Sequence, residues 1–159
     1  MGRTMALDIG KRRIGVALGD PTGIVASPLE VLEWGRGCRE LPDREAVLRR
    51  LAEMIACHEV DCLVVGVPRS MGGGMGPQGE YVMEWVDFLE TGLDVAVVTQ
   101  DERLSTAGAR RALLEGNVDR RTRRGLVDKM AAALILETYL GRVRREDEGC
   151  SEEGERRER

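Results

Sequence analysis

Short apolar runs dominate the first third of the chain and predict strands. Residues 4–9 and 13–18 are two such runs, and the turn "GKRR" between them is typical of a β-hairpin. Residues 24–33 form a third extended segment, in which Pro28 favours an edge strand or a bulge. The amino-terminal part is therefore expected to be an antiparallel sector of a sheet.

Further along, continuous apolar runs alternate with helical patterns. The runs "DCLVVGVP" and "LDVAVVTQDE" predict strands covered on both faces. Asp43 is suited to cap a helix in which Val47, Leu51 and Met54 share a face. Three more segments have helical spacing: "EYVMEWVDFLE", "STAGARRALLEG" and "LVDKMAAALILETYL". Because strands that follow crossover helices pair in parallel, the order predicts an α/β protein whose mixed sheet carries helices on its faces.

Length and composition indicate a single domain with a polar tail. The chain has 159 residues, of which 42% are apolar and 33% charged. From Arg142 onward apolar residues almost vanish, so we expect a domain over residues 1–141 and a disordered tail over residues 142–159. No apolar run is long enough for a bilayer, and the start has no signal-peptide pattern, which predicts a cytoplasmic protein without a membrane partner.

The cysteines offer a candidate metal site that other features disfavour. Cys57, His58 and Cys62 lie close together, but no paired CxxC spacing occurs. Cys57 ends a predicted helix, His58 falls in the following turn, and Cys62 belongs to a strand. We therefore favour a structural role for all three and expect reduced thiols.

Several acidic residues lie at positions where the predicted strands and the last helix would bring their carboxylates close together. Asp8 interrupts the first strand; alternation sends it to the face opposite Leu7 and Ile9. Asp101 and Glu102 follow the strand "VAVVT", and Asp128 opens the last helix. If the first and last strands are neighbours, Asp8 and Glu102 converge at the carboxyl edge, where sites in open α/β sheets lie. Each acid alone also fits a helix cap or a surface ion pair.

Three converging carboxylates need a cation. Hard oxygen ligands suit Mg²⁺ or Mn²⁺, and two such ions are the clamp for in-line phosphodiester hydrolysis. In the mechanism that we hypothesise, Asp8 bridges two ions, while Glu102 and Asp128 complete one ion each. No residue then has to act as a nucleophile.

Basic residues accompany the acids, although the formal net charge is −4. Local patches decide nucleic-acid binding more than the sum does. Aromatic residues make up 3% of the chain, so recognition of backbone and shape is favoured over base stacking. Arg103 and Lys129 directly follow two acids, and each fits either a phosphate contact or an ion pair. The candidate nucleic-acid-binding residues are Lys11, Arg12, Arg13, Arg69, Arg103, Arg120, Arg121, Arg123, Arg124 and Lys129.

At these residues the chain resembles the YqgF (RuvX-like) family, named for Holliday junction resolution and for pre-16S rRNA processing. The similarity lies in "ALDIGKRRIGVALGDPTGIVASPLEVL", "LVVGVPRSMGGGMGPQGE", "DERLSTAGARRAL" and "LVDKMAAALILETYL", and covers about residues 4–141. It implies a ribonuclease H-like mixed five-stranded sheet with helices on both faces. It also implies Asp8, Glu102 and Asp128 as the catalytic, metal-binding set. In the glycine-rich loop, Ser70 and Gly72 replace the family's usual Asn and Asp, so we place no catalysis there.

Several functions remain compatible with these patterns. The resemblance favours a metal-dependent endonuclease that processes the 5′ end of pre-16S rRNA in ribosome biogenesis. A Holliday junction resolvase acting on four-way DNA is the alternative, and it should be a homodimer rather than a monomer because it needs two sites. A non-catalytic nucleic-acid or ribosome-associated adaptor is a third possibility. A sugar-kinase or actin-type ATP site would need a chain about twice as long.

Overall fold

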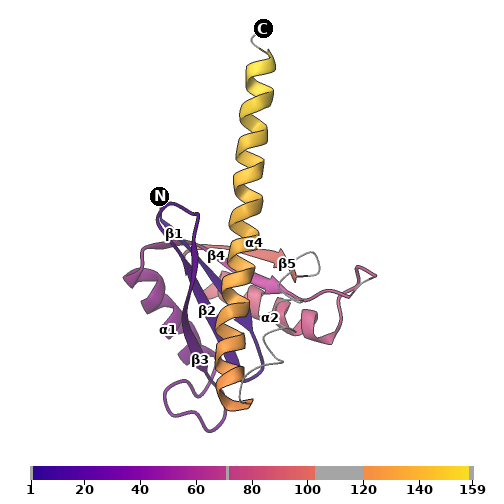
Figure 1. The fold of residues 1–159 in the computed structure, drawn as a ribbon. Coiled ribbons are helices and arrows are strands. Elements are labelled where there is room, and N and C mark those ends of the chain that lie inside the picture. The colour runs from indigo at the N-terminus through magenta and orange to yellow at the C-terminus, as the bar shows by residue number, and fades with distance from the viewer. Residues whose placement is uncertain (1, 71, 103–119, 158–159) are drawn as a thin grey trace.

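The chain folds into one mixed sheet, in the order β3-β2-β1-β4-β5 (Figure 1). This computed structural model describes residues 2–70, 72–102 and 120–157, and for 120–129 and 150–157 it describes only the course of the helix. The predicted helix "STAGARRALLEG" and Arg103 lie outside the described residues. The strands are β1 (Arg3–Ile9), β2 (Arg13–Gly19), β3 (Ala26–Glu33), β4 (Val60–Val67) and β5 (Ala96–Asp101).

The sheet has the two sectors that the sequence predicts. Strands β1, β2 and β3 pair antiparallel, whereas β4 pairs in parallel with both β1 and β5. The β1–β2 turn closes with the Gly10 amide donating to the Arg13 carbonyl at 2.8 Å. A Cβ on Gly10 would lie 2.8 Å from that same oxygen, so the turn requires glycine. The turn thereby fixes the positions of Lys11, Arg12 and Arg13 at the end of the hairpin.

Strand β3 is an edge strand with an irregular register, as Pro28 predicts. It pairs only with β2 in the described sheet, and the register shifts between Val16 and Ala17, where Pro28 pairs with Ala17. Proline has no amide hydrogen for the ladder, so an edge with a bulge is where it fits.

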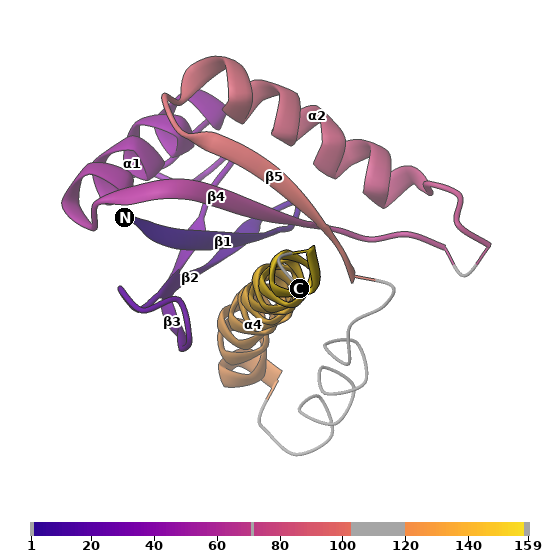
Figure 2. The ribbon, with the colours of Figure 1, turned by 90° about the horizontal axis from the view of Figure 1, so that it is seen from above.

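Helices cover both faces of the sheet (Figure 2). Helices α1 (Arg44–Cys57) and α2 (Pro77–Gly92) lie on one side, and α4 (Arg120–Arg157) lies on the other. Helix α1 begins where the sequence predicts, because a carboxylate oxygen of Asp43 accepts from the Ala46 amide at 2.8 Å. The fold class is therefore the mixed five-stranded sheet with helices on both faces that the resemblance implies.

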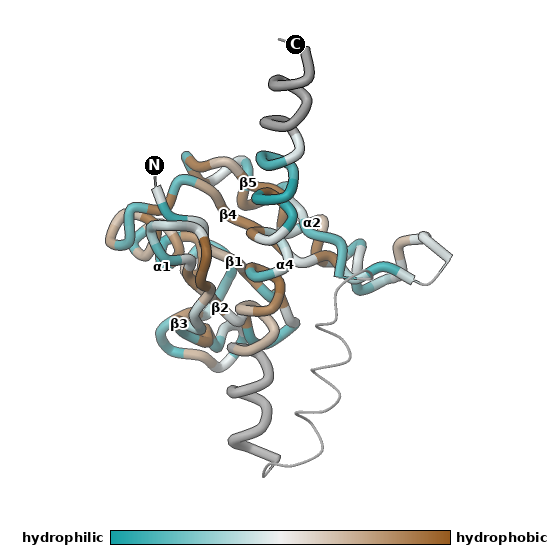
Figure 3. The backbone as a smooth tube through the Cα atoms, turned by 45° about the horizontal axis from the view of Figure 1, so that its top comes forward, coloured by the Kyte–Doolittle hydropathy of each residue, from teal (hydrophilic) through white to brown (hydrophobic). Residues whose placement is uncertain are grey.

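The core on the α4 side of the sheet contains more small side chains than the core on the α1–α2 side. On the α1–α2 side, large residues such as Met5, Leu51 and Trp85 are fully buried, and Trp85 makes an edge-to-face contact with Trp34 at 5.0 Å between ring centroids. On the α4 side the core includes Ala6, Ala17, Ala132 and Ala133. Small residues on both partners let α4 lie close to the sheet. Figure 3 shows the strands as largely hydrophobic.

Helix α4 continues beyond the sheet, into the residues for which we expected a tail. The helix runs to Arg157, and its residues 144–149 are exposed. An extension needs no new nucleus, and Glu and Arg are strong helix formers. Arg142 and Glu146, one turn apart, form an ion pair at 3.2 Å. The domain boundary at residue 141 stays a prediction.

None of the described helices combines the length and the apolar composition that crossing a bilayer would require.

Candidate active site

Asp8 projects from β1 toward the α4 side of the sheet. Its neighbours in the chain, Leu7 and Ile9, belong to the opposite core, whereas Ala6 packs with α4. Side chains alternate along a strand, so Asp8 shares the face of Ala6. It is half-buried and pairs with Gly15 in the ladder to β2. The face predicted for Asp8 is therefore correct.

Glu102 reaches the same face from the end of β5. Its carboxylate oxygen Oε1 lies 2.5 Å from the point where a Cβ on Gly66 would stand. The Cδ1 atom of Ile135, from α4, lies 2.4 Å from that point. Gly66 belongs to β4, so the carboxylate of Glu102 leans over the central strand. Only glycine leaves room for both neighbours.

Asp8 and Glu102 line one pocket at the carboxyl edge of β1 and β4. The pocket has a volume of about 260 Å³. Asp8 and Glu102 were expected to converge if β1 and β5 were neighbours, but β4 lies between these strands. Gly66 makes the convergence possible across β4. The pocket is lined by Asp8, Ile9, Gly10, Gly66, Pro68, Gln78, Val82 and Glu102.

The predicted third acid, Asp128, lies in α4. It precedes Ile135 by seven residues, or about two helical turns. The side chain of Asp128 is outside the described part, so its role as a ligand stays a prediction. Among the side chains that are described, no three acidic, histidine or cysteine groups come together as a ligand set. Cys57, His58 and Cys62 are among these described side chains.

Asp101 and Arg69 form an ion pair beside the site. The Nε atom of Arg69 lies 3.9 Å from Oδ2 of Asp101, and the side chain of Arg69 is 37% exposed. At this distance and exposure the pair is weak, so Arg69 remains available to solvent and to an anion.

The hairpin cations lie next to the pocket, since Gly10 lines it. Lys11 and Arg12 are exposed, and Nη1 of Arg12 donates to the Arg36 carbonyl at 3.5 Å. Arg13 differs, because its Nε lies 3.4 Å from the Glu33 carboxylate. Side chains of the other predicted cations lie outside the described part: Arg103, Arg120, Arg121, Arg123, Arg124 and Lys129.

Gly66 and Gln78 are among the residues of the pocket that were not predicted from the sequence. Gly66 interrupts the apolar run "LVVGVP", and a glycine within a strand often marks a close approach, so a signal was present. Gln78 lies in the first turn of α2, behind Pro77, and carries no comparable signal. The glycine-rich loop before it folds on itself, with the Ser70 hydroxyl donating to the Gly74 carbonyl at 2.9 Å.

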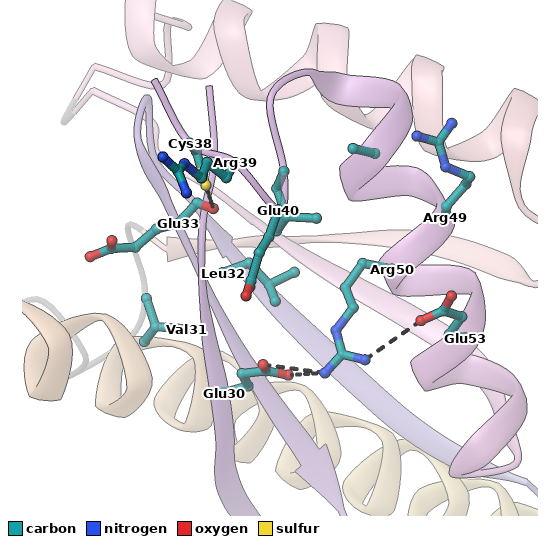
Figure 4. A pocket seen from close by; sticks show the side chains of 12 residues that line it. Glu30, Val31, Leu32, Glu33, Cys38, Arg39, Glu40, Arg49, Arg50 and Glu53 are labelled. Atoms are coloured by element: carbon teal, nitrogen blue, oxygen red, sulfur yellow. Dashed lines mark hydrogen bonds and ion pairs between the residues drawn. The ribbon is translucent and has the colours of Figure 1, made fainter. Parts of the chain in front are cut away.

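A larger pocket, of about 680 Å³, lies between β3 and α1 (Figure 4). Arg50 in this pocket is paired with two of its acids, since it lies 3.0 Å from Glu30 and 3.6 Å from Glu53. It shares no lining residue with the Asp8 pocket. We therefore place the candidate active site at Asp8 and Glu102.

Comparison with known proteins gives the family. The family model described as "RuvX: Holliday junction resolvase" matches residues 2–142. The chain belongs to the RuvX family. A RuvX-family relative from Desulforudis audaxviator, named "Putative pre-16S rRNA nuclease", is 47% identical over 138 residues, which are 87% of this chain and 93% of that protein. A relative of the same name from Roseiflexus sp. is 42% identical over 139 residues, with 87% and 94% covered.

Solved structures agree on the fold. The structure "T. thermophilus RuvC in complex with Holliday junction substrate" matches with a TM-score of 0.52 at 16% identity. The match covers 89% of this chain and 97% of the RuvC chain. At this identity the likeness concerns the fold, and it supports the ribonuclease H-like architecture predicted from the sequence.

Proposed function

We propose that this RuvX-family chain is a divalent-cation-dependent endonuclease that trims the 5′ end of pre-16S rRNA. The observation that carries the proposal is the convergence of Asp8 and Glu102 over Gly66, from two strands that are not neighbours. Two carboxylates in one small pocket repel each other unless a cation joins them. The names of the relatives point to RNA as the substrate.

The residues of the pocket fit a divalent cation. Asp8 and Glu102 offer the hard oxygen ligands that Mg²⁺ and Mn²⁺ prefer, and Asp128 is the predicted third ligand. When bound, such ions activate water and stabilise the leaving oxygen of a phosphodiester. The protein's part is to hold the carboxylates in place, which the β1 ladder and the contact of Glu102 with Gly66 do.

Substrate binding is assigned to the hairpin. Lys11 and Arg12 place positive charge beside the pocket, where the phosphate backbone would pass. None of the residues that line the pocket is aromatic, so base stacking has no platform there. Recognition then depends on backbone charge and RNA shape.

A cleavage assay with a matched control tests this function. Precursor 16S rRNA ends are incubated with the full chain and Mn²⁺ or Mg²⁺, and Asp8→Asn is compared with Asp61→Asn. Asp61 is an exposed acid at the other end of the sheet, where it accepts from the Gly2 amide at 2.8 Å. We expect Asp8→Asn to abolish cation-dependent cleavage and Asp61→Asn to retain it. Equal cleavage by wild type and Asp8→Asn would refute the site.

Four-way DNA is the second candidate substrate, because the matching family model is described as a Holliday junction resolvase. A resolvase must present two sites with two-fold symmetry. Preferential cutting of a DNA junction, by a species that sediments as a dimer, would favour this alternative over RNA. Binding of RNA without any cleavage by wild type would favour the adaptor.

A further inference from the structure

Gln100 is the only buried polar side chain in the part of the chain that the structure describes. It is 8% exposed, and no hydrogen-bond partner of its side-chain oxygen Oε1 is found among the described residues. Its Nε2 donates to the Asp101 carbonyl at 3.4 Å. A buried amide oxygen without a donor is unfavourable, so such an atom calls for an explanation.

The sheet register places Gln100 in the row of the site. Gln100 pairs with Gly66 across β4 and β5, and Leu7 pairs with Val65 across β1 and β4. If this parallel register is continued by one residue on each strand, Asp8 falls beside Gly66, and both residues line the same pocket. Asp8, Gly66 and Gln100 therefore form one row across three strands.

This row faces α4 at all three positions. Val98, two residues before Gln100, packs against the α4-side core, so alternation puts Gln100 on that side as well. The carboxylate of Glu102 lies over Gly66, the middle of the row. Gln100 and Asp8 consequently flank the position of this carboxylate.

The chemistry of the residues in this row indicates which group donates a hydrogen bond to the side-chain oxygen of Gln100. An ionised carboxylate has no hydrogen to donate, so Asp8 and Glu102 cannot satisfy an amide oxygen. A hydrated divalent cation can, since its bound waters are strong donors and Mg²⁺ keeps several of them. An amide adds an acceptor to the row without adding a further negative charge.

We propose that Gln100 is a positioning residue of the cation site, with its side-chain oxygen accepting a hydrogen bond from water bound to the ion that Asp8 and Glu102 hold. The inference rests on the proposed function, because it requires the cation. Gln100 thus orients the hydration shell and contributes to cation affinity without touching the substrate.

The test is a titration of the full chain with Mn²⁺ alone, in which free Mn²⁺ is followed by electron paramagnetic resonance without any nucleic acid. Gln100→Met keeps the shape and removes the acceptor, whereas Gln100→Glu keeps an oxygen acceptor. Partners of this kind typically change metal affinity by about 10-fold or more. We expect Gln100→Met to raise the Mn²⁺ dissociation constant by about 10-fold and Gln100→Glu to bind at least as tightly as wild type.

Melting without metal separates this role from a structural one. Because Gln100→Met removes an unsatisfied buried oxygen, its metal-free melting temperature should equal or exceed that of wild type. Wild-type Mn²⁺ affinity in Gln100→Met, or an equal loss in Gln100→Glu, would overturn the proposal. If Gln100→Met does not fold, Gln100→Asn is used in its place, because its side chain is one methylene shorter and moves the oxygen away from the site. Wild-type Mn²⁺ affinity in Gln100→Asn would also overturn the proposal.

Asp8→Asn in the same titration separates the role of Gln100 from the existence of the cation site. If Asp8→Asn loses Mn²⁺ while Gln100→Met binds it like wild type, the cation site stands and the role of Gln100 is wrong. If Asp8→Asn binds Mn²⁺ like wild type, the proposed active site itself is refuted.

Discussion

Because Gly66 has no side chain, the Glu102 carboxylate has room to lie over β4 in the site. The Cβ of any other residue would lie 2.5 Å from the Glu102 carboxylate and 2.4 Å from Ile135. The first contact belongs to the site and the second to the packing of α4. One position therefore links the proposed cation site to the stability of the core.

Gly66→Ala should damage both properties. The added methyl group must displace Glu102 or Ile135, so we expect a loss of about 1–3 kcal/mol in the free energy of unfolding, as for other overpacked positions. Chemical denaturation measures this loss, and Mn²⁺ titration should show weaker binding. Gly141→Ala is the matched control, because nothing lies within 4 Å of its added Cβ. Within helix α4 that control should be stabilising by about 0.5–1 kcal/mol.

Asp20 offers a residue-scale prediction on pH. The pKa of its carboxyl is held well below the usual range, first by the Thr22 hydroxyl and then by the backbone amide of Val25 and others, against a smaller opposing effect of burial. A lowered pKa in the folded state stabilises the protein above the unfolded pKa, about 3.9, and this gain is lost as the pH falls toward the folded-state pKa.

Asp20→Asn should therefore be less stable than wild type near neutral pH, and the difference should shrink in acid. Urea denaturation of both proteins at about pH 7 and about pH 2.5 measures it. If the two proteins differed in stability by the same amount at both pH values, the hydrogen bonds to Asp20 would not depend on its negative charge.

At the scale of elements, local patterns predicted the five strands and the helices that the structure describes, but the order of the strands across the sheet needed the structure. The side on which Asp8 stands follows from alternation within β1, and the start of α1 follows from Asp43. That β4 lies between β1 and β5 depends on pairing between distant segments. For this reason the reach of Glu102 over Gly66 and the place of Gln100 in the row were not predicted.

Composition alone does not determine whether the residues after 141 form a helix. Dense charges of both signs are typical of disorder, yet the same residues favour a helix once α4 precedes them. Figure 3 shows that the coloured part of α4 nearest the C-terminal end is hydrophilic. It therefore adds helix without adding to the hydrophobic core.

Deletion of residues 142–159 should leave cleavage intact, because the site lies at the carboxyl edge of the sheet and Leu140, before the cut, is buried in the α4-side core. The helical signal in circular dichroism should fall. A large loss of cleavage, with the deleted protein still folded, would contradict a domain that ends at residue 141.

At the scale of the whole molecule, a net charge of −4 must be reconciled with an anionic substrate. Lys11 and Arg12 are exposed beside the pocket, while Arg13 is paired with Glu33. Local cations can bind RNA although the total charge is negative, and such binding releases counterions and depends on salt.

We expect Lys11→Ala and Arg12→Ala each to lower the slope of log affinity against log salt concentration by about 1 in RNA-binding measurements. Arg144→Ala, in the exposed extension of α4, is the matched control and should leave the slope unchanged. A decrease of the same size in Arg144→Ala would show that the extension contacts RNA as well, and would contradict a binding site confined to the hairpin.

The division of the core between two faces has a consequence for the order of events during synthesis. The described large-residue core on the α1–α2 side is complete once Leu89 and its neighbours in sequence have left the ribosome. The opposite core needs Ala132 to Leu140, so the face that carries Asp8 stays uncovered until these residues emerge. In the order of synthesis, the residues that cover the face of Asp8 therefore come last among those of the two described cores.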